Sequence, residues 1–185
     1  MTYDKKWLIN ERQSGNKEEF ILFWGHHPSQ NGKIDKSCLS QWFDVSFIVD
    51  NIKYLTAEHW MMAEKARLFK DVNILPEILN AKTPAIVKSL GRKIKNFNED
   101  LWDNYKYGCV KRGNLYKFSQ NIELKNYLLS TGNRILVEAS PWDSIWGIGL
   151  SKEDPAALIP EKWPGDNLLG FALMEARDEI RSKLV

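Results

Sequence analysis

Apolar residues from position 56 to position 66 fall on several faces of a helical projection, so this stretch predicts a helix buried on more than one side. Ala, Met, Glu and Lys favour helix, and Thr56 is a suitable N-cap. Glu58 and Lys65 are seven positions apart, close to two turns at about 3.6 residues per turn. The two residues are therefore expected on one helix face, roughly 10 Å apart along the axis.

The Glu58–Lys65 pair admits two interpretations. Met61 and Met62 lie between the two charges, and a carboxylate and an amine in an apolar wall can hold a small polar substrate. Long helical side chains lean toward the N-terminus, which points Lys65 back toward Glu58. Alternatively, Glu58 only complements the helix dipole and Lys65 extends to solvent; helix geometry by itself favours this, since charged residues are usually exposed. Glu64, about 120° from that face, is expected to be a solvated charge.

Short apolar runs rich in β-formers predict a small sheet. Asp50 and Asn51 supply a turn between two such runs, which predicts a hairpin leading directly into the helix. Residues 26–37 contain Pro, Gly, Ser and Asn and are expected to form a loop. The predicted strands are residues 19–24, which end at Gly25, residues 43–49 with their return over 52–54, and residues 134–139.

Helices are expected over most of the remaining chain, with Lys111–Asn114 as a candidate interruption and 116–119 as its resumption. In the last helix Glu175 is expected to lie largely outside, with Leu169 and Ile180 at core spacing. The fold class predicted is α+β, a predominantly helical single domain over residues 1–185 with a small mostly antiparallel sheet. The expected helices are residues 76–80, 85–90, 99–110 and 121–131, and a last one after residue 167.

Composition excludes several classes of protein. At 185 residues the chain is large enough for a real core, and 43% hydrophobic with 27% charged residues is typical of an ordinary globular protein. The net charge of +2, without a basic stripe, gives no case for a nucleic-acid groove. Cys38 and Cys109 form no disulfide framework and no metal-ligand spacing with the histidines, so no metal is predicted. No stretch suits a signal peptide or a membrane span, and a cytoplasmic location is expected.

Two irregular segments carry further candidate chemistry. Asp143 follows the last predicted strand and lies between Trp142 and Trp146, where desolvation disfavours an ionised carboxylate and fits it for proton transfer. The alternative is an Asp that caps a turn through its own backbone. Gly165 and Asn167 precede the last helix, whose free N–H groups can hold a phosphate; the alternative is an ordinary helix start.

A set of short blocks keeps a fixed order from about residue 20 to the C-terminus. The blocks are Leu39–Trp42, Tyr54–His59, Lys65–Ala66, Lys88–Arg92, Lys117–Asn121, Val137–Ser140 continuing through Asp143 to Trp146–Gly149, and Gly165–Gly170. Together they resemble the YbiA-like proteins, also called the NADAR (NAD- and ADP-ribose-associated) family. One departure is Gln41, where many members of that family carry Asn.

The resemblance implies an N-glycosidase with a YbiA-like domain whose core spans about residues 20–184. Family members are similar to enzymes that cleave ribosylamine-type intermediates of early riboflavin biosynthesis, and others remove ADP-ribose from guanine bases. A small phosphoribosyl or ADP-ribosyl substrate is therefore expected, with ADP-ribosylated nucleic acid as the further partner, and no cofactor. The implied site consists of Glu58, Lys65 and Asp143 as catalytic residues and Gly25, Gln41, Trp102, Trp146, Gly147 and Asn167 as substrate-binding residues.

The expected chemistry is cleavage of a C1–N bond, which develops positive charge on the sugar and needs a proton on the leaving nitrogen. Glu58 and Asp143 are the candidate carboxyl groups, with their two roles left open, by analogy with glycoside hydrolysis. Lys65 offers a second route, because a neutral amine can attack C1 of the opened sugar and form a Schiff base. The alternatives are a non-catalytic module that binds ADP-ribose or a phosphoribosyl ligand, and a purely structural helical domain, which leaves the blocks unexplained.

Overall fold

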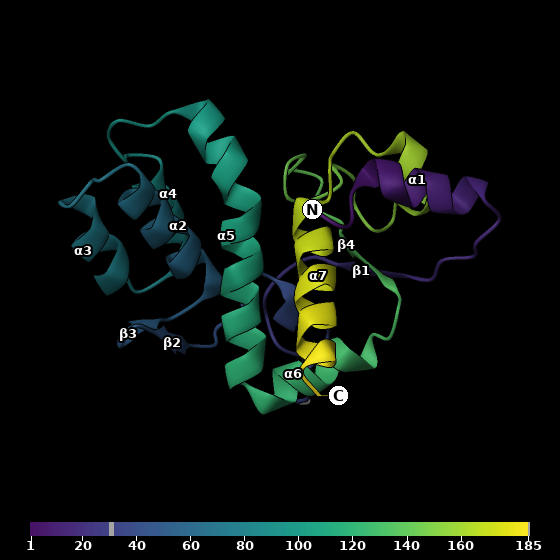
Figure 1. Cartoon of the computed structure of the whole chain (residues 1–185), viewed down its shortest axis with the longest axis horizontal. Coiled ribbons are helices and arrows are strands. Elements are labelled where there is room, and N and C mark those ends of the chain that lie inside the picture. The colour runs from purple at the N-terminus through teal and green to yellow at the C-terminus, as the bar shows by residue number, and fades with distance from the viewer. Residues whose placement is uncertain (30–31, 185) are drawn as a thin grey trace.

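Two long helices, α5 (Glu99–Gln120) and α7 (Leu168–Ser182), pack side by side at the centre of the molecule (Figure 1). The computed structural model describes residues 1–29 and 32–184. Three helices lie on one side of this pair, and the strands β1 and β4 with α1 lie on the other (Figure 1). The three helices are α2 (Ala57–Leu68), α3 (Ile74–Asn80) and α4 (Pro84–Gly91).

Four short strands form two separate pairs. β2 (Phe47–Val49) and β3 (Ile52–Tyr54) make the predicted antiparallel hairpin, with positive φ at Asp50 and Asn51 as a tight turn requires. β1 (Phe20–Phe23) and β4 (Ile135–Glu138) pair in parallel. The predominantly helical α+β fold is thus confirmed, and the parallel pair adds a feature that the sequence did not indicate. Because it is parallel, both strands end at the same edge.

The remaining elements are short. α1 (Lys5–Gln13) was not predicted; its cap is Asp4, whose carboxylate accepts the Trp7 N–H at 2.6 Å, and it buries Leu8 completely. The expected loop over 26–37 contains the start of the 3₁₀ helix η1, and its residues 30–31 lie outside the described part. The others are η1 (Lys36–Leu39), α6 (Ile122–Ser130), η2 (Pro155–Leu158) and η3 (Pro160–Lys162).

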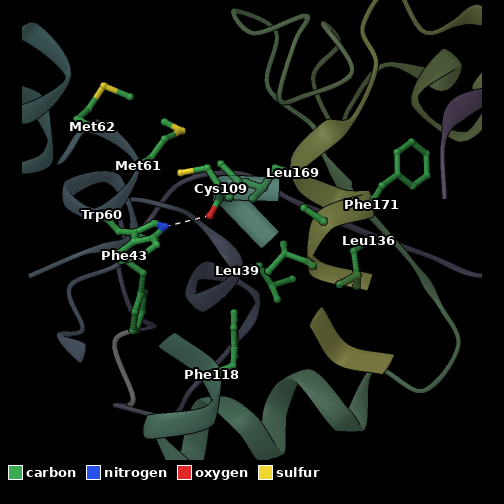
Figure 2. Packing of buried hydrophobic residues seen from close by; sticks show 14 of the residues in the cluster. Leu39, Phe43, Trp60, Met61, Met62, Cys109, Phe118, Leu136, Leu169 and Phe171 are labelled. Carbon is green, nitrogen blue, oxygen red and sulfur yellow. Dashed lines mark hydrogen bonds between the residues drawn. The ribbon is translucent and has the colours of Figure 1, made fainter. Parts of the chain in front are cut away.

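The predicted interruption of α5 is wrong, because this helix is continuous through Lys111–Asn114. Gly113 sits against Trp60 of α2, and a Cβ on Gly113 would lie 2.4 Å from Trp60 Cδ1. The same indole donates a 3.0 Å hydrogen bond from Nε1 to the carbonyl oxygen of Cys109, the dashed line in Figure 2. Tertiary packing onto α2 therefore stabilises the turn that its composition predicted to be weak.

The last helix has the predicted core face, but one of its carboxylates is buried rather than exposed. Leu169 and Ile180 are buried, as expected from their spacing. Glu175 was expected outside, yet it is 9% exposed. It accepts a 2.9 Å hydrogen bond from the Tyr107 hydroxyl and pairs with the Lys111 ammonium at 3.3 Å. The neighbouring α5 thus covers this carboxylate and provides its partners. Within residues 1–29 and 32–184, no helix is long and apolar enough to cross a membrane.

Candidate active site

A cavity of about 690 Å³ opens between α2, α4, the start of α5 and the segments that follow β1 and β4. Its size is within the range usual for small-molecule sites. Seven of the nine residues singled out in the sequence line it, and their roles remain predictions. The seven are Gly25, Gln41, Glu58, Lys65, Trp102, Asp143 and Trp146. Among the described residues, no group of three or more His, Cys, Asp or Glu could hold a metal ion.

Glu58 is the second residue of α2 and reaches the cavity from its first turn. The helix is capped by Thr56, and it is buried on more than one side, as predicted. Glu58 is only 3% exposed, and its Oε1 has no hydrogen-bond partner in the part of the chain that the structure describes. Burial raises the pKa of Glu58 to about 7, with Asp143 adding to the shift and the positive charge of Lys88 opposing it. This carboxyl group can therefore exchange a proton near neutral pH.

Lys65 lines the same cavity two turns further along α2. Its ammonium donates a 3.1 Å hydrogen bond to the Gly91 carbonyl and lies 4.3 Å and 5.5 Å from the ring centroids of Phe97 and Trp102. Burial lowers the pKa of Lys65, and the negative charge of Glu58 opposes that shift. The amine is thus held on an aromatic wall rather than released to solvent.

Glu64 is not the solvated charge that was expected. Its carboxylate accepts hydrogen bonds of 2.8 Å from Arg67 and 2.8 Å from the Tyr105 hydroxyl. Tyr105 belongs to α5, so this carboxylate joins α2 to α5. Its role is packing of the two helices, and it does not line the cavity.

Asp143 adopts the turn-capping geometry that was weighed as its alternative. Its Oδ1 accepts backbone hydrogen bonds from Ile145 at 3.0 Å and from Trp146 at 2.8 Å. Asp143 also lines the cavity, and its charge acts on Glu58 and Glu138 there. The carboxylate thus contributes to the site electrostatically from a position that the turn holds in place.

At the start of α7 the structure agrees with the ordinary helix start that was the alternative to a phosphate site, because the backbone N–H groups of residues 165–169 already have partners. Residues 165–169 each donate to a carbonyl oxygen within 144–148, at 2.9 to 3.3 Å. Asn167 and Gly147 are also the two predicted substrate-binding residues that do not line the cavity within the described chain. Asn167 is fully buried, and Gly147 packs so that a Cβ would lie 2.7 Å from Glu138 O. Both residues hold the backbone behind the site.

The cavity contains a carboxyl group that sequence reasoning did not select. Glu138 is the last residue of β4, and its Oε2 is buried with no hydrogen-bond partner among the described residues. Burial raises the pKa of Glu138 to about 8, with smaller contributions from Asp143 and Glu58. A charged residue directly after the apolar run Ile135–Val137 was the signal available in the sequence.

Several aromatic and basic residues that line the cavity were also missed. The Lys88 ammonium lies 5.8 Å from the centroid of the Trp42 ring. The side chains of His26 and His27 follow β1 and contact each other, their ring centroids 4.3 Å apart. Single aromatic and basic residues were weak signals in the sequence, and only the fold brings them to one opening. The further lining residues are Trp24, Ser40, Met61, Met62, Gly91, Arg92, Ser140, Trp142, Ile145 and Leu169.

Gln41 lines the cavity with one end of its side-chain amide held. Asn114 donates a 2.9 Å hydrogen bond to Gln41 Oε1, and the Gln41 carbonyl accepts the Glu58 N–H at 3.0 Å. Gln41 Nε2 is buried without a partner in the described chain. A buried donor without a partner is costly unless a ligand satisfies it, so this N–H₂ group is well placed to contact a substrate.

Comparison with known proteins agrees with this geometry. Residues 22–181 match the NADAR domain family. An N-glycosidase of Acanthamoeba polyphaga mimivirus is 42% identical over 167 residues, which cover 88% of this chain and 96% of that protein. The riboflavin biosynthesis protein PYRR of Zea mays chloroplasts is 36% identical over 141 residues, 71% of this chain and 20% of that protein.

The fold comparison leads to the same family. The NMR structure of the E. coli protein YbiA matches with a TM-score of 0.73 and 25% identity, covering 91% of this chain and 89% of that chain. The resemblance found in the sequence is therefore confirmed by a family match, by relatives and by a solved structure. The chain belongs to the NADAR family, and it is an N-glycosidase, a hydrolase acting on N-glycosyl bonds.

Proposed function

We propose that the substrate is a phosphorylated N-riboside, hydrolysed at the bond between C1 of the ribose and the nitrogen of a planar base. The observation that carries the proposal is Glu58, a buried carboxyl group whose Oε1 has no hydrogen-bond partner within residues 1–29 and 32–184, facing a cavity that Lys65 also lines. A proton-exchanging carboxyl and an amine in one desolvated cavity are the groups that this cleavage needs.

The lining of the cavity supports this class of substrate. Trp102 and Trp146 offer flat rings for stacking on a base. Lys88 and Arg92 bring positive charge to the same cavity and can receive a phosphate, in place of the start of α7. A ribosylamino-pyrimidine intermediate of early riboflavin biosynthesis fits this description, in line with the name of the maize relative. ADP-ribosyl-guanine, free or in nucleic acid, fits it as well.

Glu58 and Asp143 are candidate carboxyl groups for the proposed reaction, with their roles left open. As the C1–N bond breaks, positive charge develops on the sugar, and a carboxylate close to C1 stabilises it. A protonated carboxyl group donates to the leaving nitrogen, and water completes the hydrolysis at C1. A raised pKa keeps part of the Glu58 population protonated at neutral pH, so Glu58 can take either role in different molecules.

Lys65 gives the proposed reaction a covalent route. In the ring-opened substrate C1 is joined to the base nitrogen as an iminium; the neutral amine of Lys65 adds to C1, and the base leaves on its nitrogen with a proton from the lysine amine. Water later hydrolyses the resulting Schiff base and releases the sugar. The lowered pKa of Lys65 increases the neutral fraction. The aromatic wall of Phe97 and Trp102 keeps the amine away from solvent.

Borohydride trapping followed by intact mass, with ADP-ribose and with ribose 5-phosphate, tests this function. A reduced adduct on wild type that is absent from Lys65→Ala, but present on the exposed control Lys53→Ala, places Lys65 at the sugar. The sugar that adds then identifies the substrate class. If no adduct forms, assays with a ribosylamino-pyrimidine phosphate and with ADP-ribosyl-guanosine follow. Cleavage of either compound would indicate direct hydrolysis without a covalent intermediate. Failure to cleave either compound would contradict the proposed function.

A further inference from the structure

Glu138 is held in the cavity by an unusually complete set of backbone contacts. Its N–H donates to Asn167 Oδ1 at 2.9 Å, and its carbonyl oxygen accepts the Ile148 N–H at 2.9 Å. The Asn167 amide also donates from Nδ2 to Leu136 O at 2.9 Å, so one side chain makes hydrogen bonds to β4 at two positions. Parallel pairing with Phe23 fixes the other edge of Glu138.

The residues around these hydrogen bonds are restricted in backbone conformation and in side-chain size. Asn167 has a φ of 55°, which a side chain other than Asn, Asp or Gly rarely adopts. A Cβ on Gly170 would lie 2.0 Å from Leu136 O, and one on Gly147 would lie 2.7 Å from Glu138 O. Close approach of α7 and of the 143–149 turn to β4 therefore requires these glycines. The result is a rigid backbone under a single carboxyl group.

The carboxyl group of Glu138 makes no contact among the described residues that explains it as part of the fold. Its Oε2 is buried and has no hydrogen-bond partner in the described chain, although it lines an open cavity. The charged groups around it are Glu58 from α2, Asp143 from the turn and Lys88 from α4. Two like charges and one opposite charge surround a desolvated carboxyl group, so the protonated form is favoured.

We propose that Glu138 is the catalytic acid that donates the proton to the leaving nitrogen, with Asn167 as its positioning residue. This inference rests on the proposed function. The electron pair of the C1–N bond goes to the nitrogen, which takes the proton from Glu138 and leaves as the free base. Water forms the new C1–O bond and returns one proton to the cavity carboxylates, which restores Glu138.

The neighbours of the three carboxyl groups explain the choice of Glu138. Asp143 commits Oδ1 to two backbone N–H donors, which fixes that oxygen as a turn cap. Glu58 has the charges of both Lys88 and Lys65 and a hydrogen bond from Trp42 to favour its ionised form. Among the described residues Lys88 is the cation that acts on Glu138, and burial raises the pKa of Glu138. Fewer neighbouring groups thus favour the ionised form of Glu138 than that of Glu58.

The test uses Glu138→Gln, which keeps shape and cannot donate as an acid, with the exposed Glu19→Gln as the matched control. On whichever candidate substrate the wild type cleaves, we expect kcat to fall about 100-fold or more with KM little changed, and the alkaline limb of the pH profile to disappear. Glu138→Asp, which keeps a carboxylic acid, should retain more activity than Glu138→Gln. Thermal unfolding should show that both variants remain folded.

Three outcomes count against the inference or its basis. If Glu138→Gln retains kcat within about threefold of wild type and the same alkaline limb, Glu138 is not the acid and the proposed function still stands. An equally large loss in Glu138→Asp and Glu138→Gln, without change of the pH profile, assigns Glu138 a structural role and overturns the inference. A wild type that cleaves neither candidate overturns the proposed function itself.

Discussion

The Lys117 ammonium lies 2.7 Å from the carbonyl oxygen of Ser40, and it donates a second 2.7 Å hydrogen bond to the carbonyl of Cys38. Lys117 is fully buried on α5, and Ser40 begins the segment that carries Gln41 and Trp42 into the cavity. Burial lowers the pKa of Lys117 to about 8. A charged amine inside the protein thus fixes one wall of the active site.

Replacing Lys117 with Met should remove a specific pH dependence of stability. From about pH 8 to about pH 10.5 the unfolded chain still binds the proton that folded Lys117 has lost, so wild-type stability rises across that window by about 3 kcal/mol from this group. Lys117→Met should lack this rise and should also lower kcat, because the Cys38 and Ser40 carbonyls lose their donor. Urea unfolding of both proteins at pH 7.5 and pH 10 measures the pH dependence of the free energy of unfolding. Parallel stability curves for the two proteins would show that Lys117 does not titrate in this range.

Glu58→Gln should separate stability from activity. The folded chain retains the Glu58 proton that the unfolded chain releases between about pH 4.5 and pH 7, so this carboxyl lowers wild-type stability with rising pH by up to about 3 kcal/mol. The variant should therefore be relatively more stable at pH 8 than at pH 4.5 while kcat falls about 100-fold or more. Urea titrations and initial rates test both parts. A variant as active as wild type would remove Glu58 from the mechanism.

Lys65→Arg tests the covalent route at constant charge. Arg retains a cation over Phe97 and Trp102 but has no primary amine to form a Schiff base. We expect turnover to fall by about three orders of magnitude or more, with no borohydride adduct. Steady-state rates and intact mass provide the measurement. Near-normal turnover in this variant would leave direct hydrolysis by the carboxyl groups as the reaction path.

Gly113→Ala should destabilise the protein although Ala favours helix. The added methyl group meets Trp60 at 2.4 Å, and overpacking of this kind costs about 1–3 kcal/mol. Gly108→Ala on the same helix is the control, because its nearest neighbour is Arg112 at 3.6 Å, and it should stabilise by up to about 1 kcal/mol. Chemical denaturation of the two variants should give shifts of opposite sign. Equal shifts would mean that Trp60 moves aside.

Asn167→Ala should weaken the junction of β4 and α7. It removes both buried hydrogen bonds to β4, at a cost of about 2–3 kcal/mol, and places Ala at a positive φ. Asn96→Ala is the matched control, because Asn96 has the same φ of 55° but is exposed. Thermal unfolding should therefore separate the lost contacts from backbone strain. If both variants lose the same stability, the two hydrogen bonds from Asn167 to β4 contribute nothing to it.

Local structure was largely readable from the sequence. The Thr56 cap, the hairpin turn at Asp50 and Asn51 and the spacing of α7 depend on neighbouring residues, and each appears as expected. Helical periodicity placed Glu58 and Lys65 on one face of the helix, and the structure shows that both residues line one cavity. These features were predictable because contacts within about one or two helical turns decide them.

The sequence by itself determined the helical α+β class, the buried α2 helix and its two charged residues, because periodicity and capping are local properties. Only the tertiary structure decided that α5 runs unbroken past Gly113, that the N–H groups before α7 are already bonded, and that Glu138 enters the cavity. The physical reason is that burial and hydrogen-bond partners come from segments distant in the chain. A free N–H group or a desolvated carboxyl group is therefore a property of the folded arrangement, and no local pattern records it.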